Sequence, residues 1–212
     1  MKIYKESDFS ILLFRPILNM DSSNIEILQI GAPQLQEKSL PLDFPFSSEV
    51  LNTVSALTAL LAPNRLIGIS APQIGINQRI FVTHIREPGN SESTLRVFIN
   101  PIISFLSKEG RDMYEGCGSV LKNGLFGPVY RPDIVTVEAY DLEGKRFLLK
   151  TDGLLSRVIQ HEFDHLEGIL FTEKVSDYRK LLSLEAYKQF AQTSTEQKEA
   201  YKINTLEFSY LG

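Results

Sequence analysis

Residues 151–168 read TDGLLSRVIQHEFDHLEG, and this stretch predicts the helix around which the fold is organised. Thr151 or Asp152 can cap its first turn, and Gly168 is a natural residue for the turn that ends a helix. The two histidines of the stretch are four residues apart. Their imidazoles therefore lie on one face of the helix, where they can chelate a single metal ion.

The residues around the histidine pair predict a catalytic metal site in a pocket. Leu154, Val158, His161 and His165 follow one another at i, i+4, i+7 and i+11, so the histidine face is turned toward apolar neighbours. Glu162 is displaced by about 100° around the helix. From there it can act as a general base on water at the metal without being a ligand.

A third ligand has to come from elsewhere, because catalytic metal sites typically use three protein ligands and leave a fourth position open. No histidine follows His165, and the third histidine of the chain, His84, stands alone in a strand-like segment and is assigned a structural role. The only cysteine, Cys117, lies between Gly116 and Gly118. Flanking glycines permit close backbone approach, so Cys117 is the best candidate.

Composition indicates one globular domain in a reducing compartment, with the cytoplasm as the default. The 212 residues are 43% hydrophobic and 23% charged, which is enough for a core without disulfides. The net charge of −4 gives no general reason to bind nucleic acid. The strongest apolar stretch near the N-terminus is cut by Arg15 and Pro16, so neither a membrane span nor a signal peptide is expected.

The rest of the chain predicts an α+β fold, with short antiparallel β-sheets around the central helix. A second helix should begin at Ser47 or Ser48 and end at Pro63-Asn64. Strands are predicted at residues 25–30, 66–70, 79–84, 95–99, 134–140 and 146–150. The expected divisions are an N-terminal extension at 1–24, a catalytic domain at 25–175, and a C-terminal helix and tail at 176–212.

Three motifs, in this order, make the sequence resemble the peptide deformylase family. They are Gly68-Ile69-Ser70-Ala71-Pro72-Gln73, Glu115-Gly116-Cys117-Gly118-Ser119, and Gln160 followed by His161 to His165. Asn100-Pro101 and Leu166 to Phe171 extend the likeness. The resemblance covers roughly residues 25–173 and implies a hydrolase that releases formate from the N-formylmethionine of nascent proteins.

The resemblance also implies a role for each matching residue. Cys117, His161 and His165 would bind the metal, while Glu162 would handle protons. Gln73 and the backbone N–H of Gly118 would hold the oxyanion, and Glu115 would support the third motif. The backbone of three residues would pair with the substrate peptide: Ile67, Gly68 and Gly116. The implied metal is Fe²⁺, with Zn²⁺, Ni²⁺ or Co²⁺ as substitutes, because a thiolate with two imidazoles suits all of them.

Departures from the family pattern leave alternatives open. Leu66 stands where the family usually has Gly, Ser70 where it has Ala, and Gly118 where it has Leu; the last change predicts a wider pocket wall. No arginine lies between Ser119 and Arg131, so a substrate-gripping arginine is not identifiable. The rivals are a silent relative that binds peptide N-termini, against which Glu162 argues, and a deacylase for another N-acyl group.

The C-terminal stretch raises the question of a ribosome contact, which the family resemblance implies for a C-terminal helix. Residues 174–202 hold six basic and four acidic side chains. That balance is too weak to predict RNA binding, and sequence-specific nucleic-acid binding is not expected.

Overall fold

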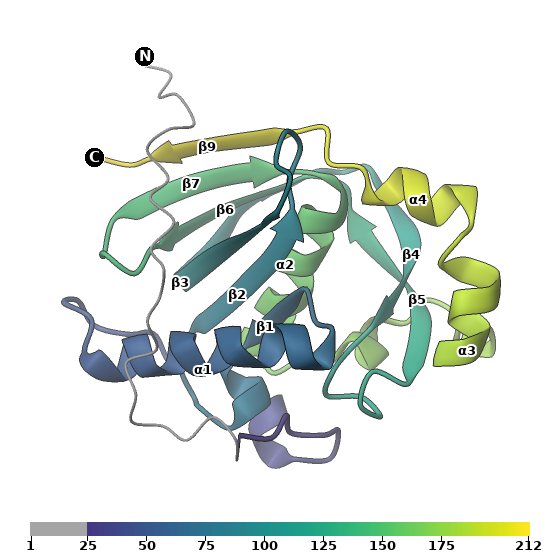
Figure 1. Ribbon diagram of the computed structural model, residues 1–212, viewed down its shortest axis with the longest axis horizontal. Coiled ribbons are helices and arrows are strands. Elements are labelled where there is room, and N and C mark those ends of the chain that lie inside the picture. The colour runs from purple at the N-terminus through teal and green to yellow at the C-terminus, as the bar shows by residue number, and fades with distance from the viewer. Residues whose placement is uncertain (1–24) are drawn as a thin grey trace.

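The computed structural model describes residues 25–212, and the N-terminal extension predicted at 1–24 lies outside the described residues. Two antiparallel sheets flank the central helix α2, Gly153–Leu166 (Figure 1). The six-stranded sheet has the order β1-β2-β3-β6-β7-β9. Its strands are β1 Gly68–Ser70, β2 Ile80–Arg86, β3 Ser93–Leu106, β6 Val135–Tyr140, β7 Arg146–Thr151 and β9 Leu206–Tyr210.

The smaller sheet has the order β4-β5-β8. Its strands are β4 Gly110–Gly116, β5 Leu125–Pro132 and β8 Leu182–Ser183. The other helices are α1 Ser48–Asn64, α3 Leu184–Ala186, which continues into a π-helical turn at Tyr187–Ala191, and α4 Thr195–Tyr201. Short 3₁₀ turns lie at Pro33–Gln36, Ala71–Ile74, Phe171–Lys174 and Tyr178–Lys180.

The two long helices cover opposite faces of the six-stranded sheet. Alternation along β2 decides which side chain meets which helix, because successive side chains of a strand point to opposite faces. Ile80 and Val82 pack against the apolar face of α1, whereas Phe81 packs against α2. Burial on both faces therefore fixes the position of α2, and with it the histidines.

The predicted elements with strong local signals are confirmed. Helix α1 ends at Asn64, after which Arg65 takes a left-handed conformation with φ 54°. The hairpin of β6 and β7 pairs Tyr140 with Arg146, and Gly144 supplies a positive φ of 74° in its turn. The prediction of an α+β fold built on antiparallel sheets is correct.

Residues 25–30 do not form the predicted strand. They belong to neither sheet, and two of their backbone N–H groups bond to the loops of the first and second motifs: Leu28 N donates to Gln73 O at 2.8 Å, and Ile30 N donates to Ser119 O at 2.7 Å. An apolar alternating segment was expected to join a sheet, but here it ties the loop of the first motif to that of the second.

The C-terminal helix predicted within residues 176–212 is divided into short helical segments. Ser183 and Ser194 break it, because each side-chain oxygen accepts a backbone N–H and starts a new short helix. The tail after it is strand β9, which pairs with β7. Within residues 25–212, no helix has both the length and the apolar character needed to cross a membrane.

Candidate active site

Three possible metal ligands converge at the end of β4 and on one face of α2. The ligand atoms of Cys117, His161 and His165 all lie within 4.8 Å of one another. Cys117 Sγ is 3.2 Å from His165 Nε2. Metal–sulfur and metal–nitrogen distances of about 2.0–2.3 Å place the ligands of a tetrahedral site roughly 3.5 Å apart. The spacing therefore suits one ion.

The hydrogen bonds of the two histidines also leave ring nitrogens available to bind a metal ion. His161 Nδ1 lies 3.0 Å from Glu115 Oε2, which leaves Nε2 of the same ring for an ion, as carboxylate-oriented histidine ligands require. His165 presents Nε2 to the cysteine sulfur, and its buried Nδ1 has no hydrogen-bond partner within residues 25–212. All three ligands thus present a donor atom to the same point.

Glu115 is the centre of a buried ion cluster. Its Oε1 accepts from Arg131 Nε at 2.6 Å and Arg157 NH1 at 2.7 Å, and its Oε2 accepts from Arg131 NH2 at 2.9 Å. Burial alone would raise the pKa of Glu115, but the Arg131 charge and the His161 hydrogen bond outweigh it and hold the pKa well below its usual value. The carboxylate stays ionised and orients His161.

The cluster continues along α2 to Asp164. Arg131 NH1 donates to Asp164 Oδ2 at 2.7 Å, and Lys174 Nζ donates to Asp164 Oδ1 at 2.7 Å. Arg131 is only 3% exposed, so one buried guanidinium joins Glu115 on β4 to Asp164 on α2. The strand and the helix that carry the ligands are held together by charge as well as by apolar packing.

The two histidines have opposite acid–base properties. Burial lowers the pKa of His161, but hydrogen bonds to Cys117 and Glu115 reverse the effect and leave it well above its ordinary value. Burial and the neighbouring His161 charge hold the pKa of His165 well below its ordinary value. His165 is therefore an uncharged imidazole that can bind a metal without losing a proton. His161 has to lose a proton when it binds the metal.

Glu162 follows His161 on α2 and is not part of the ligand cluster. It is 3% exposed, and burial raises the pKa of its carboxyl to about 7. A Cβ added to Gly68 would be 2.7 Å from Glu162 Oε1, so the bare backbone of Gly68 gives this carboxyl its room. The other oxygen, Oε2, is buried without a hydrogen-bond partner in the described part of the chain. A carboxyl poised near neutrality is suited to proton transfer.

Gln73 brings an amide donor to the same place. Its Oε1 accepts from Ser70 N at 2.8 Å and from Ser70 Oγ at 3.0 Å, and these two bonds fix which way the amide faces. Its Nε2 therefore points to Cys117 Sγ at 3.6 Å and Ser119 Oγ at 3.2 Å. A donor next to the ligand sulfur is placed to stabilise negative charge on a group bound there.

Comparison with known proteins gives the site its family. Residues 25–181 match the family model described as polypeptide deformylase. The chain belongs to this family. A peptide deformylase of Treponema pallidum strain Nichols is 34% identical over 163 residues, which is 77% of this chain and 95% of the relative. One of Desulfitobacterium hafniense is 37% identical over 150 residues, covering 70% of this chain and 93% of the relative.

Solved structures agree with this assignment. The Met-Ala-Ser-bound class I type b peptide deformylase of Acinetobacter baumannii superposes with a TM-score of 0.65 at 30% identity, covering 71% of this chain and 98% of that chain. The Synechococcus elongatus peptide deformylase in complex with actinonin gives 0.68 at 31% identity, covering 78% and 87%. This enzyme is accordingly a metal-dependent hydrolase that removes the N-formyl group from the N-terminus of nascent proteins.

One departure from the deformylase pattern is compensated inside the structure. A Cβ added to Gly118 would be 3.3 Å from Leu66 Cδ2 and 3.7 Å from Ile27 Cδ1. Leu66 therefore occupies the space that a side chain at position 118 would take. Leu66 packs against the small residue at position 118, and this packing argues against the wider pocket wall that Gly118 alone predicts.

The three residues expected to pair with a substrate backbone lie at sheet edges. Gly68 is in β1, an edge of the six-stranded sheet, and Gly116 ends β4, an edge of the smaller one. Ile67 is 42% exposed, but its carbonyl already accepts from His84 N at 2.8 Å. His84 takes part in this backbone contact and lies outside the ligand cluster.

Sequence reasoning missed the deformylase ion cluster. Arg157 and Asp164 could have been predicted to lie near His161, because they are four residues before it and three residues after it and so share its side of the helix. Arg131 could not have been predicted, since it reaches Glu115 from the neighbouring strand β5. Ser70 appeared only as a departure from the family pattern, although its hydroxyl bonds to Gln73.

Proposed function

We propose that Cys117, His161 and His165 bind the catalytic metal ion and that Glu162 is the general base for deformylation. The convergence of these three ligand atoms within 4.8 Å is the observation that carries the proposal. A divalent ion in this position would supply a Lewis acid and lower the pKa of a coordinated water toward neutrality. The protein's own residues would do the rest.

Glu162 would take one proton from the attacking water through its unpartnered Oε2. As the water oxygen adds to the formyl carbon, negative charge moves to the formyl oxygen. Gln73 Nε2 and the N–H of Gly118 would donate to that oxygen, and such a donor is worth about 3 kcal/mol. The carbon–nitrogen bond then breaks, and Glu162 returns its proton to the leaving nitrogen. The products are a free peptide amine and formic acid, which loses its proton to water as formate.

The peptide would lie between the two sheet edges. Backbone groups of Gly68 on the edge strand β1 and of Gly116 on the edge strand β4 would pair with an extended chain, as in other cases of strand addition. Ile67 would pair through its N–H, because its carbonyl already accepts from His84 N. This placement brings an N-formylmethionyl end next to Glu162, because Gly68 lies against that carboxylate. Residues 25–175 would then form the catalytic domain.

We propose Fe²⁺ as the working ion and the cytoplasm as the compartment. A lone cysteine that acts as a thiolate ligand needs a reducing environment. Iron and the adjacent sulfur are both oxidised by air, so activity should decay aerobically with Fe²⁺ and persist with Ni²⁺ or Zn²⁺. Contact between the C-terminal region and the ribosome stays a prediction, tested by cosedimentation with ribosomes at physiological salt.

The decisive experiment measures formate release from a formyl-Met peptide by the metal-loaded protein. Glu162→Gln should reduce kcat/KM by at least about 10³-fold with the metal still bound, since it removes the base and keeps the shape. Glu109→Gln is the matched control, because Glu109 is exposed and outside the site. Full activity in Glu162→Gln would remove the base from the mechanism.

The same assay with an acetyl peptide separates the rival functions. Because Leu66 fills the space beside Gly118, the formyl substrate should be strongly preferred. Comparable rates on both peptides would favour a broader deacylase. No formate release by the loaded wild type would favour a silent relative that binds peptide ends.

A further inference from the structure

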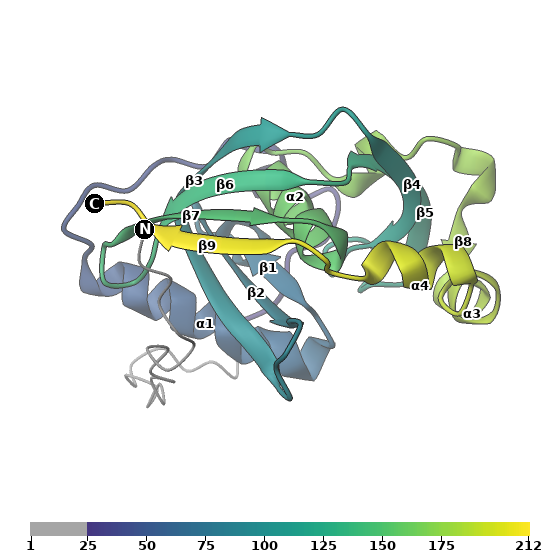
Figure 2. The same ribbon diagram turned by 90° about the horizontal axis from the view of Figure 1, so that it is seen from above.

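The family match ends at residue 181, and the chain beyond it forms a feature that we call the C-terminal strap, residues 182–212. It runs from β8 through α3 and α4 to β9, along one end of the smaller sheet and then beside β7 (Figure 2). On the way it touches both elements that carry metal ligands: β4, which leads to Cys117, and α2, which bears the histidines.

The strap grips β4 through one buried side chain. Gln197 on α4 is 4% exposed. Its Oε1 accepts from Tyr114 N at 3.2 Å, and its Nε2 donates to Tyr114 O at 3.0 Å. Both backbone polar groups of Tyr114 are thus held by one amide, as a neighbouring strand would hold them. Tyr114 directly precedes Glu115, and Cys117 follows two residues later.

An aromatic contact supports the same strand from the side. Tyr187 stacks on Phe126 with the ring centroids 4.0 Å apart and the planes 2° from parallel. Phe126 in turn lies against Gly116, where an added Cβ would be 2.6 Å from its Cε1. The hydroxyl of Tyr187 bonds to that of Tyr201 at 3.0 Å, and Tyr201 accepts from Gln197 Nε2 at 2.8 Å. The Gln197 hydrogen bonds and the stacked rings of Tyr187 and Phe126 are therefore connected through Tyr201.

The other end of the strap grips the start of α2. Asp152, the residue before the helix, accepts from Asn204 N at 2.7 Å and Thr205 N at 2.9 Å. Its carboxylate makes no cap bond to the helix itself. A Cβ on Gly153 would be 2.1 Å from Lys202 O, so the strap backbone passes directly over the first turn.

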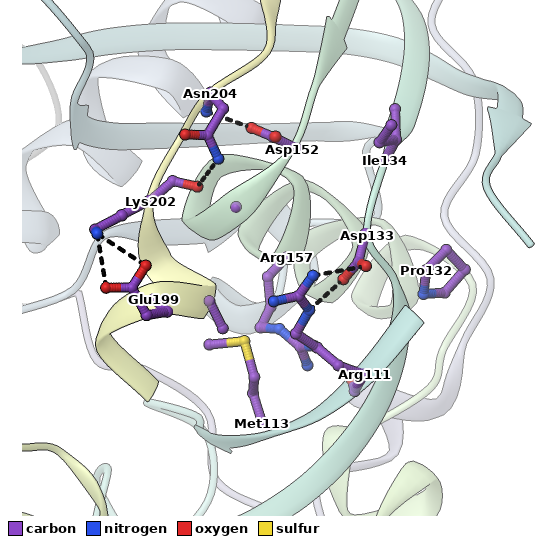
Figure 3. Close-up of a pocket in the computed structure, with 12 residues that line it drawn as sticks. Arg111, Met113, Pro132, Asp133, Ile134, Asp152, Arg157, Glu199, Lys202 and Asn204 are labelled. Atoms are coloured by element: carbon purple, nitrogen blue, oxygen red, sulfur yellow. Dashed lines mark hydrogen bonds and ion pairs between the residues drawn. The ribbon is translucent and has the colours of Figure 1, made fainter. Parts of the chain in front are cut away.

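Between the two grips, the strap closes one side of a cavity of about 230 Å³. Figure 3 shows Asn204 beside Asp152, and Lys202 paired with Glu199, around this cavity. Arg157 lines it as well and also donates to Glu115 Oε1 at 2.7 Å. None of the proposed metal ligands lines this cavity.

We propose that the C-terminal strap sets the position of the Cys117 arm relative to the two histidines, with Gln197 as its main positioning residue. The proposal rests on the metal site proposed above. Cys117 directly follows the edge strand β4, whereas His161 and His165 lie on a helix between the two sheets. The Gln197 clamp gives β4 hydrogen bonds on the side where it has no neighbouring strand, and the Asp152 grip ties that clamp to α2.

The test compares Gln197→Met with Gln192→Met in the full chain. Methionine keeps the volume of glutamine but lacks the amide oxygen and the amide nitrogen, and Gln192 is an exposed glutamine in the same strap. Two quantities are measured on folded protein: the Co²⁺ dissociation constant, by competition with a chelator, and the thiolate-to-cobalt absorption band. Gln197→Met should raise the dissociation constant about tenfold, as changes behind first ligands do, and should shift or weaken the band. Gln192→Met should change neither.

The outcomes separate the two hypotheses. If Gln197→Met binds Co²⁺ within twofold of Gln192→Met with an unchanged band, the strap does not position the site, even if the melting temperature falls. If the wild type itself binds no Co²⁺, the proposed metal site fails instead. Should Gln197→Met not accumulate as folded protein, Tyr201→Phe removes only the hydroxyl that holds Gln197. It should produce the same band shift with a rise of about threefold, and an unchanged band there also overturns the proposal.

Discussion

The pair Leu66 and Gly118 offers the sharpest test of how packing supports catalysis. The Cβ of a residue at 118 would already be 3.3 Å from Leu66 Cδ2 and 3.5 Å from Cδ1. A leucine there would add three further carbons to this already crowded Cβ. Overpacking of this kind costs about 1–3 kcal/mol, so Gly118→Leu should lower the free energy of unfolding by about 2 kcal/mol.

The reverse change removes the obstacle at a cost of its own. Leu66 is half-buried, so Leu66→Gly loses about 1 kcal/mol of burial and about 0.5–1 kcal/mol to the greater freedom of an unfolded glycine. In the double variant the new leucine fills the space left at 66. The overpacking penalty should disappear, and the two changes should couple by about 2 kcal/mol.

Urea unfolding of the four proteins, loaded with the same metal, measures this coupling. Activity gives a second readout, because Gly118 is proposed to donate its N–H to the oxyanion and a displacement of about 1 Å can cost 10²-fold. Gly118→Leu should lower kcat at least tenfold, and adding Leu66→Gly should restore most of the loss. If Gly118→Leu costs the same stability with and without Leu66, the shared volume is not what links the two positions.

Three further predictions concern the charged residues and the ligands. Because burial raises the pKa of Glu162 to about 7, the ionised carboxylate that acts as the base is lost as pH falls. Below the pKa of Glu162 in the metal-loaded enzyme, which the cation lowers, kcat/KM should therefore decline tenfold per pH unit. A flat profile of kcat/KM from pH 8 to 5 would contradict this. Arg131→Met leaves the Glu115 and Asp164 carboxylates buried without their guanidinium and should cost about 3–5 kcal/mol in chemical unfolding. The pKa of Glu115 in the folded protein is held below its usual value of 4.5. The ionised carboxylate therefore stabilises the fold above pH 4.5, and this stabilisation is lost as pH falls through the lower pKa of the folded state. Without Arg131 that pKa is less depressed, so the variant should unfold in acid at a higher pH than the wild type. Cys117→Ser should bind metal at least tenfold more weakly, since a hydroxyl is a poorer ligand than a thiolate, and wild-type affinity by chelator competition would remove Cys117 from the site.

The two long helices, α1 and α2, could be predicted because their signals are local. For α2, the polar residues before it, the apolar face and Gly168 after it lie within one stretch, and Gly168 does take a positive φ of 73°. The ligand set was reachable for the same reason: two ligands share a helix, and the third is the only cysteine. These predictions required no knowledge of which segments meet in space.

The smaller sheet could not be predicted in the same way. Strand β4 contains Gly110, Arg111 and Asp112, and β5 contains Gly127 and Pro128. Glycine, proline and charged residues usually argue against a strand. Here the two strands pair in full register from Gly110 with Pro132 to Gly116 with Phe126. Long-range pairing overrides the local preference, and this pairing also brings Arg131 to Glu115.

The C-terminal region combined visible and hidden signals. Ser194 followed by Gln197 is a capping pattern that predicts a helix start at that point, and Leu206, Phe208 and Tyr210 alternate as a strand does. The prediction of a C-terminal helix and tail used neither of these two patterns. That Gln197 would clamp Tyr114 could not be read from the sequence, because the contact joins residues 83 positions apart.

Two buried glutamates in one site show why their surroundings, and not their residue type, assign their roles. Glu115 accepts from two arginines and His161, and these partners hold its pKa well below the ordinary value. Glu162 is as deeply buried, and its Oε2 has no partner in the described residues. Burial outweighs the His161 charge and a hydrogen bond with Ser70, so the pKa of Glu162 rises to about 7. An acid that is always ionised can only orient a ligand, whereas one near neutrality can accept and return a proton. The two side chains are identical, so the difference in function comes from the groups that surround each carboxyl.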